Sequence, residues 1–320
     1  MGDEAWLQAM LDAEAALGGP ELRASEVDLS WLGREAADHA SPVVPLVRRY
    51  FPDSHAGATS QDILDTAMML ICARARRPLL ADARAAADAV AVLADAHRAT
   101  AIMGRTLLQE EIPTSFGLKA AGWMMAIDEA TSELACAPLA VQMGGPVGHR
   151  DPAVAARVSE RLGLDDPVLP WHTNRVRPAQ VACALGLLAG ALSKVARDVT
   201  LSEALREGVP GRGASSSMAH KRNPIAAVSV LACARRVPAL VATMLSCMEQ
   251  EHERAAGAWQ AEWGTVSDLF RLTGSATAWA RDLLSHLEVD ADAMRASAGE
   301  DPDLGASATL IDRALEAHRR

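Results

Sequence analysis

The sequence predicts an all-α fold with a long central helical bundle. Half of the 320 residues are hydrophobic while only 3% are aromatic, and the alanine, leucine and acidic residues that dominate the chain favour helix. One stripe of aliphatic residues recurs at alternating spacings of four and three: Val181, Leu185, Leu188, Leu192, Val195 and Val199. This spacing is typical of a helix whose stripe packs against other helices. We find no strand-turn-strand pattern.

Helix-breaking residues divide the chain into its expected elements. Proline and glycine interruptions fall at 18–20, 42–45, 52–57, 113, 144–148, 167–170, 208–213 and 299–302. Residues 81–98 and 116–142 are long helical candidates, and the aliphatic stripe follows the break at 170. The flanks of this bundle predict smaller helical pieces. Pro113 interrupts a helical pattern, so we expect a kinked helix there.

Composition and charge exclude several classes of function. The formal net charge of -10 argues against nucleic acid as a partner, since that binding needs a basic surface. The amino-terminal segment is acidic and amphipathic, unlike a signal peptide. The longest apolar run, Val181–Leu192, is too short to span a bilayer. We therefore expect a cytoplasmic protein without a membrane partner. Five scattered cysteines without a CxxC spacing give no reason to expect a metal site.

The segment "GRGASSSMAHKRNP", residues 211–224, is the most unusual part of the sequence. Its glycines exclude a regular helix, so Ser215 and the following serines are expected in a loop. Asn223 and Pro224 are suited to the N-cap and first position of a helix at 225–236. Helix N-termini attract anions, and the Lys221 ammonium would lower the free energy of a serine alkoxide. The alternative is a solvated serine and glycine linker.

The segment "HAGATSQDILDTA", residues 55–67, contains a second group of polar residues. Thr59 and Asp62 have the spacing of a capping box before an apolar helix. Taken alone, Thr59 and Ser60 are therefore better explained as helix caps than as ligands. His55 fits a surface loop histidine as well as a functional one.

Three further segments combine polar residues with helix breaks. In "GRTLLQEEIPTSFGLK", residues 104–119, a kink could present Thr106, Gln109 and Thr114 to a polar substrate. In "LPWHTNRVR", residues 169–177, His172 and Arg175 precede the aliphatic stripe. In "QEHERAAGAWQAEW", residues 250–263, we expect a helix with four consecutive charged or titratable residues, of which some must turn inward. Solvent-facing charges are the alternative.

Together, "GATSQDILDTA", "GRT", "PTSFGLK" and the serine motif resemble the fumarase/aspartase superfamily. "LQEEIPTSFGLKAAGW", "LPWHT" and "QEHERAAGAWQAEW" are similar to its 3-carboxy-cis,cis-muconate cycloisomerase branch. The likeness runs from about Trp6 to Glu288 and resumes in "LGASATLIDRALEAHR". It implies an enzyme that needs no cofactor or metal.

The resemblance also implies roles for individual residues. Ser215 would exchange a proton at carbon in a loop that closes over the substrate. His55 and His172 are further candidate catalytic residues, with His55 near the leaving-group side. Binding of a small di- or tricarboxylate substrate is implied for Thr59, Ser60, Arg105, Thr106, Gln109, Thr114, Arg175, Lys221 and Asn223. The family builds composite active sites from three subunits, so a homotetramer is expected.

The chain departs from the family pattern at several positions. Leu107 stands where many members have a histidine that protonates the leaving group, and Ala214 and Ala219 replace a usual glycine and proline. Val176 replaces a usual aspartate and His149 a small hydroxyl residue. After Met294 the family's carboxy-terminal helical domain is much reduced. The resulting division is a helical amino-terminal domain at 1–98, the central bundle at 99–290 and a carboxy-terminal remnant at 291–320.

Leu107 favours a reaction with a weakly basic leaving group, either a carboxylate or a small anion such as nitrite, over loss of an amine. A carboxylate leaving group, whose conjugate acid has a pKa of about 4, needs little acid assistance. The leading hypothesis is therefore a cycloisomerase that interconverts 3-carboxy-cis,cis-muconate and its lactone through an enolate-like intermediate, in aromatic catabolism by the β-ketoadipate pathway. The alternatives are a fumarate-releasing lyase acting on a substituted succinate, such as nitrosuccinate or an N-substituted aspartate, and a catalytically inactive structural paralogue.

Overall fold

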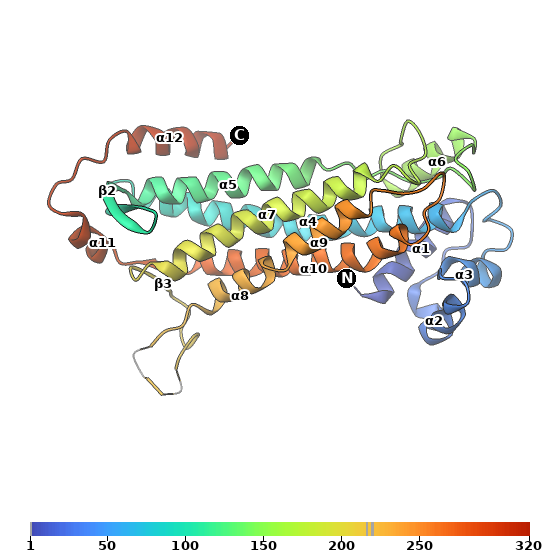
Figure 1. The fold of residues 1–320 in the computed structure, drawn as a ribbon, viewed down its shortest axis with the longest axis horizontal. Coiled ribbons are helices and arrows are strands. Elements are labelled where there is room, and N and C mark those ends of the chain that lie inside the picture. Colours follow the sequence, from blue (N-terminus) through green and yellow to red (C-terminus); the bar gives the residue numbers. More distant parts are fainter. Residues whose placement is uncertain (1, 216, 219–220) are drawn as a thin grey trace. The chain divides into compact units, whose positions relative to one another are not determined.

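The computed structural model describes residues 2–215, 217–218 and 221–320. These residues are predominantly helical (Figure 1), which confirms the all-α fold class. Contacts divide the chain into two compact units of three segments each. Unit 1 comprises Met1–Arg77, Ala137–Cys183 and Ala239–Arg271, and unit 2 comprises Pro78–Cys136, Ala184–Pro238 and Leu272–Arg320. The division expected from sequence, into parts at 1–98, 99–290 and 291–320, stays a prediction.

Unit 1 is a helical assembly around an aliphatic core. Its elements are α1 (Asp3–Ala16), the 3₁₀ turn η1 (Ala24–Glu26), α2 (Leu29–Ala37), α3 (Val43–Tyr50), α6 (Pro152–Leu162) and the parts of α4 (Ser60–Ala96), α7 (Val176–Leu201), α9 (Val237–Ser246) and α10 (Ala258–Ser285) that fall within its segments. Leu7, Leu11, Leu46 and Ile63 are at most 2% exposed. Asp28 caps α2 by accepting hydrogen bonds from two backbone N–H groups at its start.

Unit 2 contains the remaining parts of α4, α7, α9 and α10. Its other elements are β1 (Ala101–Thr106), β2 (Gln109–Ser115), α5 (Phe116–Cys136), β3 (Leu205–Glu207), α8 (Ile225–Ala234), β4 (Leu287–Val289), α11 (Ala291–Ala298) and α12 (Ser307–His318). The aliphatic stripe from Val181 to Val199 lies along α7, and all six of its side chains are buried. The predicted packing face of this helix is confirmed.

The segment around Pro113 is an antiparallel hairpin, so the predicted kinked helix is wrong. Strands β1 and β2 pair from Ala101 with Ser115 to Thr106 with Gln109. The two-residue turn consists of Leu107 (φ 49°) and Leu108 (φ 69°), both in the left-handed region. Their side chains are 97% and 73% exposed. A turn with positive φ at both central residues matches the twist of the paired strands.

The segment from residue 248 to 257 is an irregular loop, so the helix expected across residues 250–263 begins only at Ala258. His252 has a φ of 48°, which breaks the helical backbone. The Glu251 carboxylate turns back to accept the backbone N–H of Ala256 at 3.1 Å. Backbone hydrogen bonds to this carboxylate lower the pKa of Glu251.

Hydrogen bonds attach the carboxy-terminal helix α12 to other helices of unit 2. The His318 ring lies 2.8 Å from Asp128 on α5 and 3.0 Å from Asp88 on α4. Burial raises the pKa of Asp128, an effect that the His318 contact partly offsets. Arg98 donates to Asp312 of α12 at 2.6 Å. These contacts fix the orientation of the last helix.

Two helical stretches among the described residues, Val176–Leu201 and Ile225–Ser246, have the length and apolar composition of a membrane span. In the first, 56% of the most apolar window is buried inside the protein, which is also typical of the core helix of a bundle. In the second only 28% of that window is buried. This stretch therefore presents apolar side chains outward.

Candidate active site

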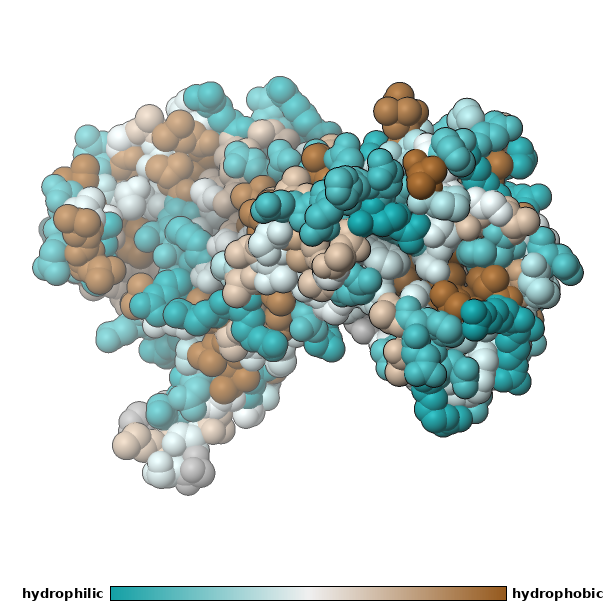
Figure 2. Space-filling view, turned by 45° about the vertical axis from the view of Figure 1, so that its right-hand side comes forward, coloured by the Kyte–Doolittle hydropathy of each residue, from teal (hydrophilic) through white to brown (hydrophobic). Residues whose placement is uncertain are grey.

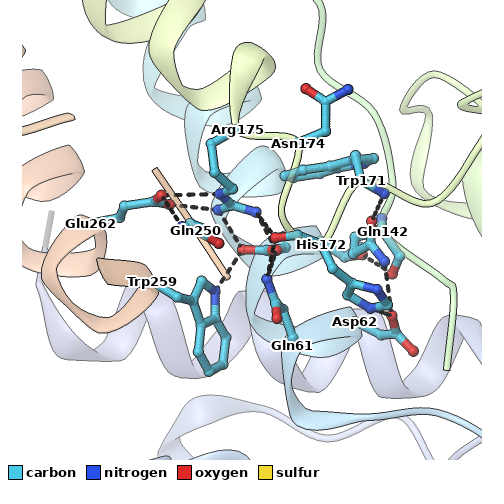
Figure 3. Close-up of polar contacts among 12 residues, drawn as sticks. Gln61, Asp62, Gln142, Trp171, His172, Asn174, Arg175, Gln250, Trp259 and Glu262 are labelled. Carbon is cyan, nitrogen blue, oxygen red and sulfur yellow. Dashed lines mark hydrogen bonds and ion pairs between the residues drawn. The ribbon is translucent and has the colours of Figure 1, made fainter. Parts of the chain in front are cut away.

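A buried carboxylate organises the first cluster of predicted site residues, in unit 1 (Figure 3). Asp62 is fully buried in the first turn of α4 and accepts the backbone N–H groups of Gly144 at 2.9 Å and Gly145 at 2.8 Å. It also lies 2.9 Å from His172 Nε2 and 3.1 Å from the Gln142 amide nitrogen. With the backbone N–H of Thr59, at 3.1 Å, five nitrogen partners compensate the desolvation of this carboxylate.

Gly144 is required by the close packing of this cluster. A β-carbon at Gly144 would lie 2.6 Å from Pro170 and 2.8 Å from the His172 ring. Any larger residue would therefore displace the segment that carries His172. His172 itself is 5% exposed, and its contact with Asp62 fixes the orientation of the imidazole.

Arg175 forms the centre of a second buried cluster in the same unit. Its guanidinium donates to both oxygens of Asp65, at 2.7 and 3.0 Å, and its Nε donates to Glu262 at 3.0 Å (Figure 3). Burial alone would lower the pKa of Arg175, but Asp65 and Glu262 outweigh it and raise that pKa. Arg175 is 1% exposed. Its hydrogen bonds thus join α4, α10 and the segment before α7.

Glu262 is the titratable member of this cluster. Burial raises the pKa of Glu262 to about 7, although hydrogen bonds from Arg175 and Gln250 act in the opposite direction. One guanidinium faces two carboxylates here, so the ionised cluster carries an uncompensated negative charge away from water. Such a charge is unfavourable and promotes protonation of one carboxylate.

Three motif segments that are far apart in the sequence converge in unit 1. The backbone N–H of Thr59 donates to Asp62 at 3.1 Å, which is one half of the predicted capping box. The Thr59 hydroxyl accepts instead from Arg254, and the Thr173 hydroxyl donates to the carbonyl of His252 at 2.9 Å. Sequence reasoning assigned no role to Arg254. The only feature of the sequence that pointed to Arg254 was the run of four consecutive charged or titratable residues to which it belongs.

His55 lies on the loop before α4 and is partly buried. Its Nδ1 is 2.7 Å from Glu14 of α1, and the Glu14 side chain is 3% exposed. The second carboxylate oxygen of Glu14 is buried without a partner among the described residues. Ser60, the first residue of α4, is also partly buried.

In unit 2, the hairpin carries four of the predicted binding residues. Arg105 donates to Glu110 at 3.1 Å, and the Thr106 hydroxyl donates to Glu111 at 3.2 Å. Arg105, Thr106 and Gln109 are exposed, and Thr114 is partly buried. The hairpin places Thr106 opposite Gln109 next to the turn, whereas Thr114 pairs with Ile102 nearer its base.

The described part of the serine loop surrounds the Ser215 hydroxyl with N–H donors. Ser215 Oγ accepts the backbone N–H groups of Met218 at 3.1 Å and Ser217 at 3.3 Å. Two such donors would stabilise negative charge on this oxygen. Lys221 is exposed. Ser216 and the predicted departure at Ala219 lie outside the described residues.

The base of the serine loop is closed by contacts between its two ends. The Asn223 amide donates to the carbonyl of Gly213 at 3.0 Å, and a β-carbon at Gly213 would lie 2.1 Å from the Asn223 carbonyl oxygen. Gly213 also has a φ of 70°, so only glycine fits this position without strain. Arg212 pairs with Asp282 and lies over the ring of Trp279.

The N-terminus of α8 differs from its predicted form. Pro224, one residue later than expected for Asn223, is the N-cap. The Glu207 carboxylate accepts the backbone N–H groups of Ala226 at 3.2 Å and Ala227 at 3.1 Å. A carboxylate of the chain itself therefore occupies these donors, as expected of an anion at a helix N-terminus.

The predicted site residues fall into two groups. His55, Thr59, Ser60, His172 and Arg175 belong to unit 1. The residues in unit 2 are Arg105, Thr106, Gln109, Thr114, Ser215, Lys221 and Asn223. In the first group, His172 and Arg175 bind carboxylates of the protein. In the second group, Ser215 has hydrogen-bond donors aimed at its hydroxyl.

Residues 52–239 match the lyase family model. The chain is 39% identical to 3-carboxy-cis,cis-muconate cycloisomerase of Bradyrhizobium diazoefficiens, over 92% of this chain and 75% of that protein. It is equally identical, at 39%, to nitrosuccinate lyase of Streptomyces davaonensis, over 93% of this chain and 73% of that protein.

A solved structure supports the same relationship. The crystal structure of the 3-carboxy-cis,cis-muconate lactonizing enzyme of Pseudomonas putida superimposes with a TM-score of 0.90 at 29% identity, covering 100% of this chain and 96% of that one. The serine loop, the hairpin and the buried clusters thus lie on a fold shared with enzymes of this kind. The chain belongs to the lyase family of the fumarase/aspartase superfamily.

Proposed function

We propose that this chain is a cofactor-independent cycloisomerase that interconverts 3-carboxy-cis,cis-muconate and its lactone. The observation that carries this proposal is the pair of N–H donors aimed at Ser215 Oγ, in a chain 39% identical to a cycloisomerase of that name. The activity would place the chain in aromatic catabolism through the β-ketoadipate pathway, in the cytoplasm.

The reaction needs one proton transfer and no redox step. In lactone formation a carboxylate oxygen bonds to one alkene carbon, and the π electrons move to the neighbouring carbon as an enolate-like dianion. The Ser215 hydroxyl then delivers a proton to that carbon. In the reverse direction the Ser215 alkoxide removes the proton and the carboxylate leaves. The N–H groups of Ser217 and Met218 stabilise this alkoxide, and Lys221 supplies positive charge.

The remaining residues have binding or positioning roles in this proposal. We assign binding of the substrate carboxylates to Thr59, Ser60, Arg105, Thr106, Gln109, Thr114, Lys221 and Asn223. His55, held by Glu14, is the acid or base near the leaving group. His172 and Arg175 are 5% and 1% exposed and bind protein carboxylates. We therefore assign them the positioning of the segment before α7.

We propose that the active form is a homotetramer with composite active sites. Figure 2 shows apolar patches between hydrophilic side chains on the viewed surface. Val228 and Leu245, in the apolar stretch 225–246, are 51% and 47% exposed, and the hairpin tip is exposed as well. Exposed apolar patches commonly bind another subunit.

A second candidate is elimination of nitrite from nitrosuccinate with release of fumarate. Leu107 at the hairpin tip cannot donate a proton, and nitrite, like a carboxylate, is a weakly basic leaving group. The equal identity to nitrosuccinate lyase supports this candidate too. A catalytically inactive paralogue is the remaining alternative.

Purified protein offered each substrate separately distinguishes the three functions. We expect loss of the ultraviolet absorbance of the carboxymuconate diene and appearance of the lactone in the NMR spectrum, at a rate proportional to protein concentration. Nitrite and fumarate formed from nitrosuccinate, without diene loss, would establish the second candidate instead. Turnover of neither substrate by the folded protein would contradict both enzymatic functions.

A further inference from the structure

A buried glutamate on α1 contacts one of the candidate catalytic histidines in unit 1. Glu14 Oε1 lies 2.7 Å from His55 Nδ1, and the Glu14 side chain is only 3% exposed. Its neighbours on the same helix, among them Leu11, Ala13 and Ala16, are buried apolar residues. A carboxylate in such surroundings is unfavourable unless a partner compensates its lost solvation. The imidazole of His55 is the hydrogen-bond partner of this carboxylate among the described residues.

The surroundings of Glu14 differ from those of the structural carboxylate Asp62. Asp62 has five nitrogen partners. The second oxygen of Glu14, Oε2, is buried without a partner among the described residues. A buried ion pair with unmet hydrogen bonds contributes little to stability. The burial of Glu14 is therefore better explained by its effect on the imidazole than by a contribution to the fold.

Other contacts fix the backbone of the loop that carries His55. The His55 N–H donates to the carbonyl of Phe51 at 3.4 Å, and its own carbonyl accepts the N–H of Ala58 at 2.9 Å. Phe51 is 1% exposed, and a β-carbon at Gly19 would lie 2.7 Å from the Phe51 ring. The loop thus packs closely against the chain that follows α1. What the Glu14 carboxylate adds is the orientation of the His55 ring.

The contact distinguishes the two nitrogens of this ring. A neutral imidazole carries one proton, and a nitrogen that faces an ionised carboxylate has to be the donor. Nδ1 of His55 therefore holds that proton toward Glu14. The other nitrogen, Nε2, has no hydrogen-bond partner among the described residues and is not a buried atom. Nε2 is thus the nitrogen available to a substrate.

We propose that Glu14 is the positioning residue of His55, whose carboxylate keeps one proton on Nδ1 so that the ring exchanges its other proton through Nε2. This role rests on the proposed function, in which His55 is the acid or base near the leaving group. In lactone opening a proton passes from Nε2 to the leaving carboxylate oxygen, and lactone formation returns it to Nε2. The negative charge of Glu14 stabilises the imidazolium form of the ring.

The protonated nitrogen of His55 is measurable without turnover. In protein labelled with ¹⁵N only in histidine, two-bond correlations at alkaline pH distinguish a ring protonated on Nδ1 from one protonated on Nε2. The spectrum of His55→Gln identifies the His55 signals among the nine histidines. We expect the neutral ring to carry its proton on Nδ1. Protonation on Nε2 in the unmodified chain would overturn the proposal.

The variant Glu14→Gln removes the charge and keeps the size of the side chain. Its amide can accept a hydrogen bond from Nδ1 or donate one to it, so the Nε2-protonated form of His55 should appear in the spectrum. Glu4→Gln, at an exposed position on the same helix, is the matched control and should leave the His55 signals unchanged. An unchanged His55 spectrum in folded Glu14→Gln would contradict the role of the carboxylate.

Turnover shows whether Glu14 acts through His55. On whichever proposed substrate the unmodified chain converts, Glu14→Gln should lower kcat on the order of tenfold with KM changed less than about twofold. The double variant with His55→Gln should lose no more than His55→Gln alone, and Glu4→Gln should keep full activity. Losses that multiply in the double variant would overturn the positioning role.

Failure of the proposed function is distinguishable from failure of this inference. A folded chain that converts neither substrate contradicts the proposed function, while the ¹⁵N spectra of the unmodified chain and of Glu14→Gln still support or overturn the control of the His55 ring by Glu14. An active chain in which Glu14→Gln has both the unmodified spectrum and full kcat contradicts the inference alone.

Discussion

Individual buried carboxylates determine the shape of the segments around the candidate site. Asp62 has five nitrogen partners, whereas Asp65 and Glu262 share Arg175. The first carboxylate is fully compensated, while the second arrangement has one negative charge in excess. Buried carboxylates therefore have a structural role in the Asp62 cluster and make the Arg175 cluster sensitive to pH.

Glu262 should make the stability of the chain depend on pH. Its pKa rises from an ordinary value of 4.5 to about 7 in the folded state. Between these values the folded chain holds a proton that the unfolded chain has lost. The free energy of unfolding therefore falls as the pH rises through this window, by at most about 3 kcal/mol. Glu262→Gln, which still accepts a hydrogen bond from Arg175, should lack this decline.

Urea denaturation between pH 5 and pH 8 measures the effect. We expect the unmodified chain to lose stability relative to Glu262→Gln over this range. Glu133→Gln, at an exposed position on α5, should follow the unmodified chain. Parallel pH profiles for the unmodified chain and Glu262→Gln would show that Glu262 is ionised at acidic pH and that the cluster is compensated in another way.

At the scale of elements, the hairpin β1–β2 combines a strained turn with an apolar tip. Leucine in the left-handed region costs roughly 1–2 kcal/mol per residue, and Asn-Gly is the preferred sequence for this turn. Replacing Leu107 with Asn and Leu108 with Gly together should raise the free energy of unfolding by about 2 kcal/mol. If the tip contacts another subunit in the proposed tetramer, turnover should fall at the same time.

A matched substitution separates strain from function. Ala40 also has a positive φ, of 47°, and lies outside the candidate site, so Ala40→Gly should stabilise the chain without loss of turnover. Thermal unfolding and the diene assay provide both readouts. An Asn-Gly hairpin that is less stable than the unmodified one would refute the assignment of strain to the turn.

The sequence predicted elements with a clear period much better than it predicted loops and turns. The stripe along α7 was predicted because its 3.6-residue period is set by burial of one helix face. The hairpin was not, because Leu-Leu carries no turn signal and both faces of the distal strands are exposed. The sequence predicts a helix over residues 250–263 instead of the loop that ends at 257, because the contacts of this loop depend on partners such as Thr173 that are distant in sequence.

The candidate site shows the same division. Motifs predicted Ser215, Thr59 and His172 as candidate site residues, because a motif consists of residue types in a fixed order, and both can be read directly from the sequence. They did not show that Glu207 occupies the first N–H groups of α8 or that Asn223 closes the loop base. Nor did they show that Arg175 is enclosed by two carboxylates. The hydrogen-bond partner of each side chain depends on tertiary packing, and a local sequence pattern carries no information about that packing.

At the scale of the whole molecule, the exposed apolar stretch 225–246 is the main argument for assembly. Val228→Glu places a charge on this surface and should convert the proposed tetramer to smaller species by sedimentation velocity, with loss of activity if the sites are composite. Val92→Glu, at an apolar position of α4 that is 68% exposed, is the control and should leave the mass unchanged. A monomeric unmodified chain that turns over substrate would contradict composite sites.

The central claim is that this chain moves a proton at carbon through Ser215 while it forms or opens a lactone. Lactone formation from 3-carboxy-cis,cis-muconate in deuterium oxide, followed by proton and deuterium NMR, tests this claim directly. We predict one deuterium at a single stereochemical position on the carbon next to the carboxylate. Ser215→Ala should reduce the rate on the order of 10²-fold or more, while Ser217→Ala, which keeps its backbone N–H, should retain most of it. Unimpaired deuterium delivery by Ser215→Ala, or a lactone without stereospecific label, would contradict the account.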